Sequence, residues 1–190
     1  MTDPRARPTS VDARSRSLPD VLQFMQWLWA VVHGLETTSK RMGTSTGVTG
    51  PQRLVLRVVG LFPGLSAGEL ASVLVIHPST LTGVLQRLVA QGLLVRADDP
   101  RDRRKAVLRL TPRGARANAT DEGTVEAAVA DALDGVSFRD RAATRRVLER
   151  IACHLEPQLA ERFRAPQPQG LSRLRPWASG SSRLPKRPAT

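Results

Sequence analysis

Polar side chains of similar chemistry are grouped on the segment that follows Pro78. If this segment is a helix, with about 100° between successive residues, one face carries Gly83 and five residues with hydroxyl, amide or guanidinium groups: Ser79, Thr80, Thr82, Gln86 and Arg87. Such groups bond phosphate oxygens and the edges of nucleotide bases, and no carboxylate stands among them to repel a polyanion. A solvated helix face is the alternative, although such a face more often carries Glu and Lys.

A second cluster lies between two short segments that are typical of strands, Leu93–Arg96 and Ala106–Leu110. The connection between them holds four basic residues within five positions: Arg101, Arg103, Arg104 and Lys105. Crowded cations repel one another, and a phosphate backbone relieves that repulsion while it releases its own counterions. A solvated hairpin tip without a partner is the alternative.

The net charge of the chain is placed unevenly. The 190 residues carry a formal charge of +12, and residues 87–116 hold nine basic residues against three acidic ones. Most of the remaining excess lies at the two ends, 1–17 and 166–190. A compositional preference for Arg would explain basic ends, but it would not place a cluster inside the folded part of the chain. The charge therefore favours a polyanionic partner.

Composition and spacing exclude several other classes of protein. A hydrophobic fraction of 41% leaves enough apolar residues for a core, so a wholly disordered chain is not expected. No apolar stretch reaches the roughly 18 to 20 residues that cross a bilayer. The single Cys153 excludes an internal disulfide, and the three His show neither metal-ligand spacing nor a nucleophile–base pair. We therefore expect no enzyme, no metal and no cofactor.

Helices and two strands must position the two polar clusters. The apolar periodicity predicts helices over 18–42, 49–62, 66–74, 79–91, 112–133 and 137–163, the last interrupted at Pro157. Thr49 with Gln52 and Ser66 with Glu69 form capping boxes at two helix starts. The buried stripes are expected to be Leu54, Val55, Val58, Leu61 and Phe62 in one helix, and Leu81, Val84, Leu85, Leu88 and Val89 in another.

The first predicted helix is apolar around most of its circumference. Its two neighbouring stripes are Leu22, Met25, Trp29 and His33, and Val21, Leu28, Val32 and Leu35. A single small domain rarely covers so wide an apolar surface, so we expect this helix to pack against a second subunit as well.

Helices followed by a two-stranded wing are the order of a winged helix-turn-helix, and at this point the chain resembles the MarR family of transcription regulators. The motifs that carry the resemblance are Thr80–Leu88 (TLTGVLQRL), Gln91–Arg96 (QGLLVR), Asp99–Lys105 (DPRDRRK), Leu110–Gly114 (LTPRG) and Thr49–Leu54 (TGPQRL). The resemblance implies a mainly α fold with a small β-wing. In that fold the DNA-binding lobe, 49–111, is joined to dimerisation helices from 18–42 and 112–163. The domain then spans 18–165, between a basic tail, 1–17, and a Pro/Arg-rich tail, 166–190, both expected to be disordered.

The resemblance also implies a function and roles for particular residues. A homodimer would bind a pseudo-palindromic operator in double-stranded DNA, most simply as a repressor. Ser79, Thr80, Thr82, Gln86 and Arg87 would face the major groove. Arg104 would enter the minor groove, Asp102 would orient it, and Arg101, Arg103 and Lys105 would contact phosphates.

Family members typically release DNA when a small, often aromatic, molecule binds between the dimer helices and the lobe. Met25, Trp29, His33 and Met42 are candidates for such a pocket in this chain, with a role in the core or the interface as the alternative. Cys153 stands alone and far from the N-terminal position that peroxide-sensing relatives use, so a redox role is not expected.

A regulator of this kind would be cytoplasmic and nucleoid-associated, since residues 1–17 lack the apolar core of a signal peptide. The alternative function is a basic architectural protein that binds DNA or RNA without sequence choice. Binding to RNA would favour exposed aromatic side chains for stacking, and the chain has no Tyr, four Phe and three Trp.

Overall fold

The computed structural model describes residues 18–99 and 106–164, and the chain divides into two compact units, Met1–Leu35 and Glu36–Thr190. Within the described residues there are helices and one two-stranded antiparallel sheet, so the mainly α fold with a small wing is confirmed. The elements are α1 (Asp20–Thr46), α2 (Gly50–Leu61), α3 (Ala67–Leu74), α4 (Pro78–Ala90), β1 (Leu94–Asp98), β2 (Ala106–Leu110), α5 (Pro112–Ala119), α6 (Val125–Leu133), α7 (Phe138–Leu155) and α8 (Gln158–Arg164). The predicted tails and the wing tip, 100–105, lie outside the described residues.

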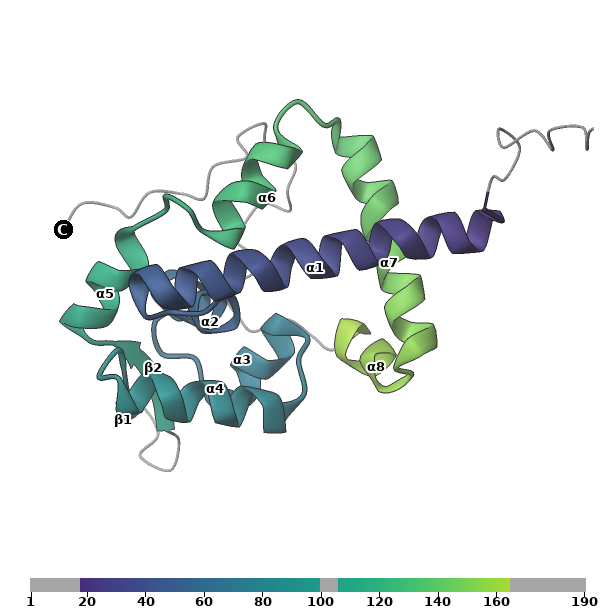
Figure 1. Ribbon diagram of the computed structural model, residues 1–190. Helices are drawn as coiled ribbons and strands as arrows, with labels where there is room; N and C mark the ends of the chain where they lie inside the picture. Colours follow the sequence, from purple (N-terminus) through teal and green to yellow (C-terminus); the bar gives the residue numbers. More distant parts are fainter. Residues whose placement is uncertain (1–17, 100–105, 165–190) are drawn as a thin grey trace, which may run out of the picture. The chain divides into compact units, whose positions relative to one another are not determined.

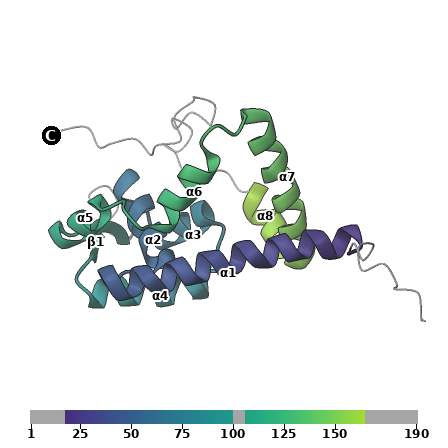
Figure 2. The same ribbon diagram turned by 45° about the horizontal axis from the view of Figure 1, so that its top comes forward.

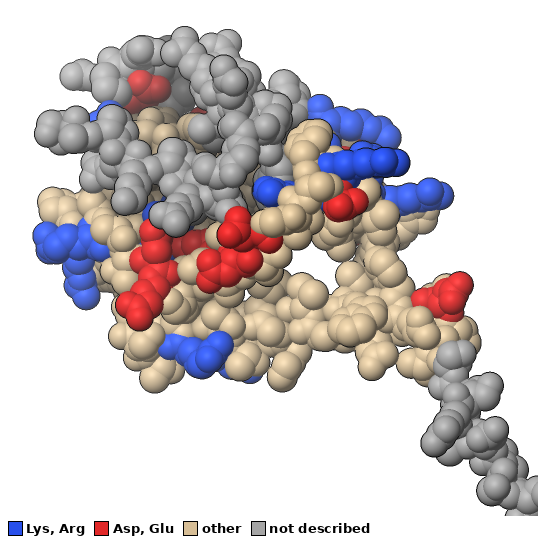
Figure 3. Space-filling view, turned by 90° about the horizontal axis from the view of Figure 1, so that it is seen from above, with Lys and Arg blue, Asp and Glu red and all other residues tan. Residues whose placement is uncertain are grey.

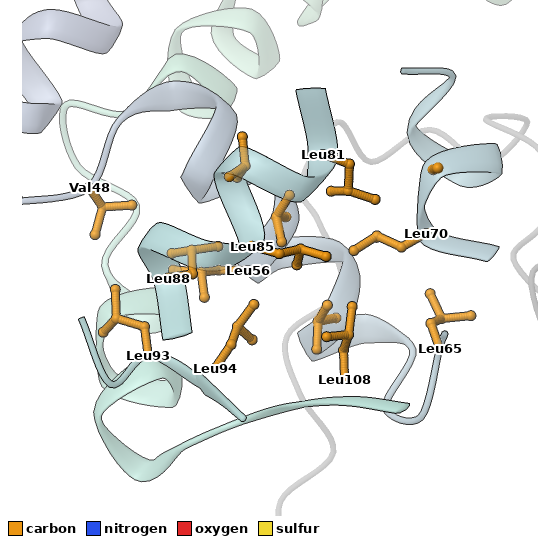
Figure 4. Packing of buried hydrophobic residues seen from close by; sticks show 14 residues of the cluster. Val48, Leu56, Leu65, Leu70, Leu81, Leu85, Leu88, Leu93, Leu94 and Leu108 are labelled. Carbon is orange, nitrogen blue, oxygen red and sulfur yellow. The ribbon is translucent and has the colours of Figure 1, made fainter. Parts of the chain in front are cut away.

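The hydrophobic core of the second unit lies where α2, α3 and α4 meet the two strands (Figures 1 and 2). Figure 4 shows leucine side chains from these elements converging, and Leu56, Leu70 and Leu88 have no exposed surface. Full burial of a leucine side chain stabilises a fold by roughly 1.5 to 3 kcal/mol. This core therefore holds α4 and the wing in a fixed relation to α2, which is what a recognition surface requires.

The helix starts of this unit follow the local rules expected from the sequence. At α2 the Gln52 Oε1 atom accepts the backbone N–H of Thr49 at 2.9 Å. At α3 the Ser66 hydroxyl accepts the Glu69 N–H at 3.2 Å while Glu69 Oε2 accepts the Ser66 N–H at 2.8 Å. These contacts satisfy amide groups that the first turn of a helix leaves without partners. Both predicted capping boxes are confirmed.

The antiparallel pair of β1 and β2 forms the base of the wing. Leu94 lies opposite Leu110 and Asp98 lies opposite Ala106, so the first strand begins one residue later and ends two residues later than predicted. Gly114 of α5 packs against this base, because a Cβ atom built on it would overlap the carbonyl oxygen of Leu93. Only glycine allows α5 to approach the wing so closely.

Two predicted helix boundaries are wrong. The first helix does not end at residue 42 but continues to Thr46, where the hydroxyls of Thr44, Ser45 and Thr46 donate to carbonyls four residues earlier. The predicted helix over 112–133 is two helices, α5 and α6, because Thr124 starts a new helix by accepting the N–H of Ala127 at 3.2 Å. Gly123 precedes it with a φ of 69°, a conformation that ends regular helix.

The buried faces of α2 and α4 differ in part from the predicted stripes. In α2 the residue Leu54 is 50% exposed, whereas Gln52 and Arg53 are buried, so the helix presents a different side to the core. In α4 the side chain of Val89 is 41% exposed, while Leu81, Val84, Leu85 and Leu88 are buried as expected. The chain leaves the helical path directly after Val89 and Ala90, which removes the neighbours that would cover Val89.

The N-terminal part of α1 exposes an unusual amount of apolar surface. Within Met1–Leu35, Val21, Trp27 and Trp29 are each at least 66% exposed. Figure 3 shows, along its lower edge, a long tan stretch without charged side chains between a blue patch toward the left and a red patch at the right end. The C-terminal helices bear out the predicted interruption, since α7 ends before Pro157 and α8 follows it.

No single helix among the described residues is both long and apolar enough to cross a membrane. The bent pair of α3 and α4, at 116° to each other, meets that criterion by length and composition alone.

Candidate nucleic-acid interface

Helix α4 is held by one face and exposes the other. Pro78 occupies its first turn, and His77 precedes it as the capping residue, with Nδ1 accepting the backbone N–H of Ser79 at 3.3 Å. The buried face packs Leu81, Leu85 and Leu88 into the core. All five polar residues expected on the opposite face are exposed: Ser79, Thr80, Thr82, Gln86 and Arg87.

Local contacts occupy two of these five side chains. The Ser79 hydroxyl lies 2.6 Å from His77 Nδ1, and the Thr82 hydroxyl donates to the carbonyl of Pro78 at 2.8 Å. Gln86 and Arg87 form no side-chain hydrogen bond within the described part of the chain. Arg87 also lies in the last turn of α4, where a cation stabilises the negative end of the helix dipole. As far as the described residues show, the exposed face thus leaves the Gln86 amide and the Arg87 guanidinium available to an outside partner.

The turn that connects α3 to α4 contains a strained residue. Val75 has a φ of 54° and a ψ of 38°, the left-handed conformation that β-branched side chains rarely adopt. Its backbone N–H bonds the last carbonyls of α3, those of Ala71 and Ser72. The sharp turn between the two helices therefore relies on a residue held against its own conformational preference.

The wing adds arginines on its two strands. Arg96 of β1 and Arg109 of β2 are exposed, and Arg109 lies opposite Val95 in the register. The residues predicted for the minor groove and its flanking phosphates, Arg101, Asp102, Arg103, Arg104 and Lys105, lie outside the described residues. Of the predicted interface, the structure thus brings together the α4 face and the base of the wing.

A charge cluster that the sequence did not predict joins α2 to the loop between α5 and α6 and to the start of α6. The Arg53 side chain of α2 is 3% exposed and pairs with Glu126 and, at 3.1 Å, with Asp121. Arg57, one turn later, pairs with the same two acids. The only signal in the sequence is the pair Arg53 and Arg57 in an otherwise apolar stretch, RLVLRVVGLF, with acidic residues about 70 positions later.

A small cavity adjoins this cluster. About 270 Å³ in volume, it is lined by two arginines, threonines and apolar side chains: Met42, Thr46, Val48, Arg53, Arg116, Ala117, Thr120 and Thr124. A neighbouring cavity of about 310 Å³ shares Thr46, Val48, Arg116 and Ala117 and extends to Gln91 and Arg113. Since Arg53 is already paired with Glu126 and Asp121, Arg116 is the cation that could face the charged end of a small organic anion, and the apolar side chains could contact its body.

Only one of the four residues proposed for a ligand pocket lines this cavity. Met42 is buried there, and its sulfur lies 3.3 Å from the backbone nitrogen of Val125. Met25, Trp29 and His33 belong to the Met1–Leu35 unit and are exposed. Cys153 of α7 is half-buried and free, and no group of three or more His, Cys, Asp or Glu within the described residues could hold a metal ion.

Comparisons with known proteins agree on one family. Residues 46–105 match the family model described as the MarR family. A transcriptional regulatory protein for the hcr operon of Thauera aromatica is 36% identical over 87 residues, which cover 46% of this chain and 52% of that protein. The HTH-type transcriptional regulator TtmR of Methylorubrum extorquens is 36% identical over 87 residues, covering 46% of this chain and 45% of its own. The chain thus matches about half the length of these curated relatives.

A solved structure extends the likeness to more of the chain. CouR from Rhodococcus jostii RHA1, bound to p-coumaroyl-CoA, is similar with a TM-score of 0.57 and 26% identity. The match covers 73% of this chain and 96% of CouR. The winged helix-turn-helix and its flanking helices are therefore a known architecture.

Proposed function

We propose that the chain, whose residues 46–105 match the MarR family model, is a DNA-binding transcriptional regulator of that family. It acts as a homodimer on a pseudo-palindromic operator, represses transcription, and releases DNA when a small ligand binds. Its place of action is the nucleoid in the cytoplasm, because its partner is double-stranded DNA. The function needs no cofactor and no membrane.

The exposed face of α4 is the observation that carries this proposal. The face combines hydroxyl, amide and guanidinium groups with the absence of any carboxylate along Pro78–Ala90, and the leucine core supports it rigidly from behind. A rigid helix face of this composition suits the major groove, where Gln and Arg bond adenine and guanine edges. The wing would contact the flanking minor groove through Arg104, oriented by Asp102, and the phosphates through Arg101, Arg103 and Lys105.

The apolar surface of α1 supports the homodimer. Trp27, Trp29 and Val31 are each more than 60% exposed although they are among the most apolar residues of the chain. A second copy of α1 would cover such a surface, and two lobes related by a two-fold axis would then match an operator with two half-sites.

The cavity beside Arg53 supports modulation by a ligand. Its volume and mixed lining suit a small organic anion, and the similar protein CouR has been solved with p-coumaroyl-CoA bound. By linkage, a ligand lowers DNA affinity only if it binds better to a lobe arrangement that DNA disfavours.

Footprinting on the DNA upstream of the chain's own gene tests the proposal. We expect a protected inverted repeat, lost in the variant Gln86→Ala/Arg87→Ala. Arg145→Ala on α7 is the matched control, since Arg145 is exposed but distant in sequence from the α4 face. Uniform protection along the duplex, unchanged by the α4 substitutions, would instead support an architectural protein that binds nucleic acid without sequence choice.

A further inference from the structure

The guanidinium of Arg53 joins parts of the chain that are distant in sequence. From the first turns of α2 it donates to the carbonyls of Ala117 and Thr120, to Asp121 Oδ1 at 3.1 Å and to Glu126 Oε1. The two carbonyls belong to the end of α5, where a helix leaves its last oxygens without partners. Glu126 lies in the first turn of α6. One side chain therefore binds the end of α5, the connecting loop and the start of α6.

Arg57 repeats part of this arrangement one turn further along α2. It donates to the carbonyl of Asn118 at 3.1 Å and to Asp121 Oδ1, and its Nε lies 3.4 Å from Glu126 Oε1. Its side chain is 18% exposed, against 3% for Arg53. Because Arg53 is more deeply buried than Arg57, its positive charge depends more strongly on an acidic partner. A buried guanidinium without such a partner is strongly unfavourable.

Apolar packing contributes little to the attachment of α6. None of the residues Val125–Leu133 is buried, in contrast to α2, α3 and α4, which supply most of the core. The connection from α5 passes through Gly123 in a left-handed conformation, which is a point of bending. The start of α6 also contacts α1 and α2, through Val125 N near Met42 Sδ and through the Val125 side chain near Gly50. The ion pairs that Glu126 forms with Arg53 and Arg57 are thus the main polar attachment of α6 to the lobe, and Arg53 is the more deeply buried of the two arginines.

We propose that Arg53 is a positioning residue that fixes the orientation of α6 relative to the DNA-binding lobe. The proposal rests on the function proposed above, in which the helices after the wing hold the partner subunit. If α6 turns about Gly123, the lobe turns relative to the dimer, and the distance between the two α4 helices changes. Arg53 would then set the fraction of dimers in which the two α4 helices have the spacing that the operator requires.

The orientation of α6 can be measured without DNA. In a Cys153→Ser chain, spin labels at Gly68→Cys on α3 and Ala128→Cys on α6 report the distance between lobe and α6, since both positions are exposed. The labelled chain is mixed with an excess of unlabelled chain, so that most dimers carry labels on one subunit and distances between labels on different subunits do not contribute. We expect one narrow distance distribution with Arg53 and a broad or shifted one with Arg53→Met or Arg53→Lys. A lysine keeps the charge but cannot reach four acceptors in different directions.

Two further variants keep the test decisive if Arg53→Met does not fold. Glu126→Gln removes one charge from a partly exposed position, and it should also broaden the distribution. Arg145→Met, on α7, should leave it unchanged. A narrow, unshifted distribution in every folded Arg53 variant and in Glu126→Gln would overturn the proposal, whatever their melting temperatures.

Operator affinity then separates this proposal from the proposed function. If the released lobe has the required orientation about one tenth of the time, the apparent Kd rises about tenfold. Arg53→Met should show that loss with its α3 and α4 amides still protected from hydrogen exchange. A parent chain that binds no operator yet keeps the narrow distribution would refute the proposed function and leave the positioning role intact.

Discussion

The close packing of Gly114 against the wing gives a prediction whose sign can be worked out from the structure. In the variant Gly114→Ala the added Cβ would overlap the carbonyl oxygen of Leu93, so α5 must move away from the wing. That movement strains the hydrogen bonds from Thr111 Oγ1 to the Gly92 carbonyl, 2.7 Å, and from Thr111 N to the Leu93 carbonyl, 3.1 Å. Helix propensity alone would favour Ala over Gly by up to about 1 kcal/mol.

The destabilising contributions to the free energy of unfolding are larger than this gain in helix propensity. Overpacking costs typically 1 to 3 kcal/mol, and each weakened hydrogen bond costs about 0.5 to 1.5 kcal/mol. We therefore expect Gly114→Ala to lower the free energy of unfolding by about 2 kcal/mol or more. With a urea dependence of roughly 2 kcal/mol per M, the unfolding midpoint falls by about 1 M.

A second glycine provides the matched control. Gly68 also lies in the first turn of a helix, α3, but a Cβ atom there meets nothing within 4 Å. Gly68→Ala should leave the midpoint unchanged or raise it. Urea unfolding followed by far-ultraviolet circular dichroism, at one chain concentration, compares both variants with the parent. A midpoint for Gly114→Ala at or above that of the parent would refute the reasoning, as would equal losses in both variants.

Three other predictions concern the helix-turn-helix, the wing and α1. Val75→Gly should raise the free energy of unfolding by about 0.5 to 1 kcal/mol, because glycine removes the cost of the left-handed conformation; a lower urea midpoint would contradict this. Arg104→Ala should weaken operator binding severely, whereas Arg173→Ala should only reduce the salt dependence of binding. Equal effects of the two substitutions in a filter-binding titration would contradict the role proposed for the wing. If the proposed homodimer forms through α1, Trp27→Glu should lower the sedimentation coefficient from that of a dimer toward that of a monomer, since Trp27 is 71% exposed in the single chain; an unchanged coefficient would contradict a subunit contact at Trp27.

The parts of the fold that local chemistry determines were predictable from the sequence. The capping pairs at Thr49 and Ser66 act over three residues, so their patterns are visible in the sequence, and the strand pair follows from short alternating segments. The break between α5 and α6 is the exception: it is local too, since Gly123 and Thr124 are respectively a helix-ending and a helix-starting residue, but it was not predicted. The apolar periodicity on both sides of this pair led to the wrong prediction of one continuous helix.

The buried charges could not be predicted in this way. Arg53 lies 73 positions before Glu126, and only the folded chain shows that its buried guanidinium is paired with two acids. The orientation of α2 depends on this pairing, because a buried Arg53 turns Leu54 toward solvent. An apolar stripe drawn from hydropathy alone places Leu54 inside, since it assigns every arginine to the surface.

The two kinds of attachment in the Glu36–Thr190 unit should differ in their response to temperature. Unfolding of the leucine core exposes apolar surface to water and therefore carries a large positive heat capacity change. Release of α6 exposes charged groups and little apolar surface, because none of its residues is buried. Its heat capacity change is accordingly close to zero, so the free energy of releasing α6 varies almost linearly with temperature, without the curvature expected for the core. In calorimetry the loss of the lobe should thus give a step in heat capacity, and the movement of α6 almost none.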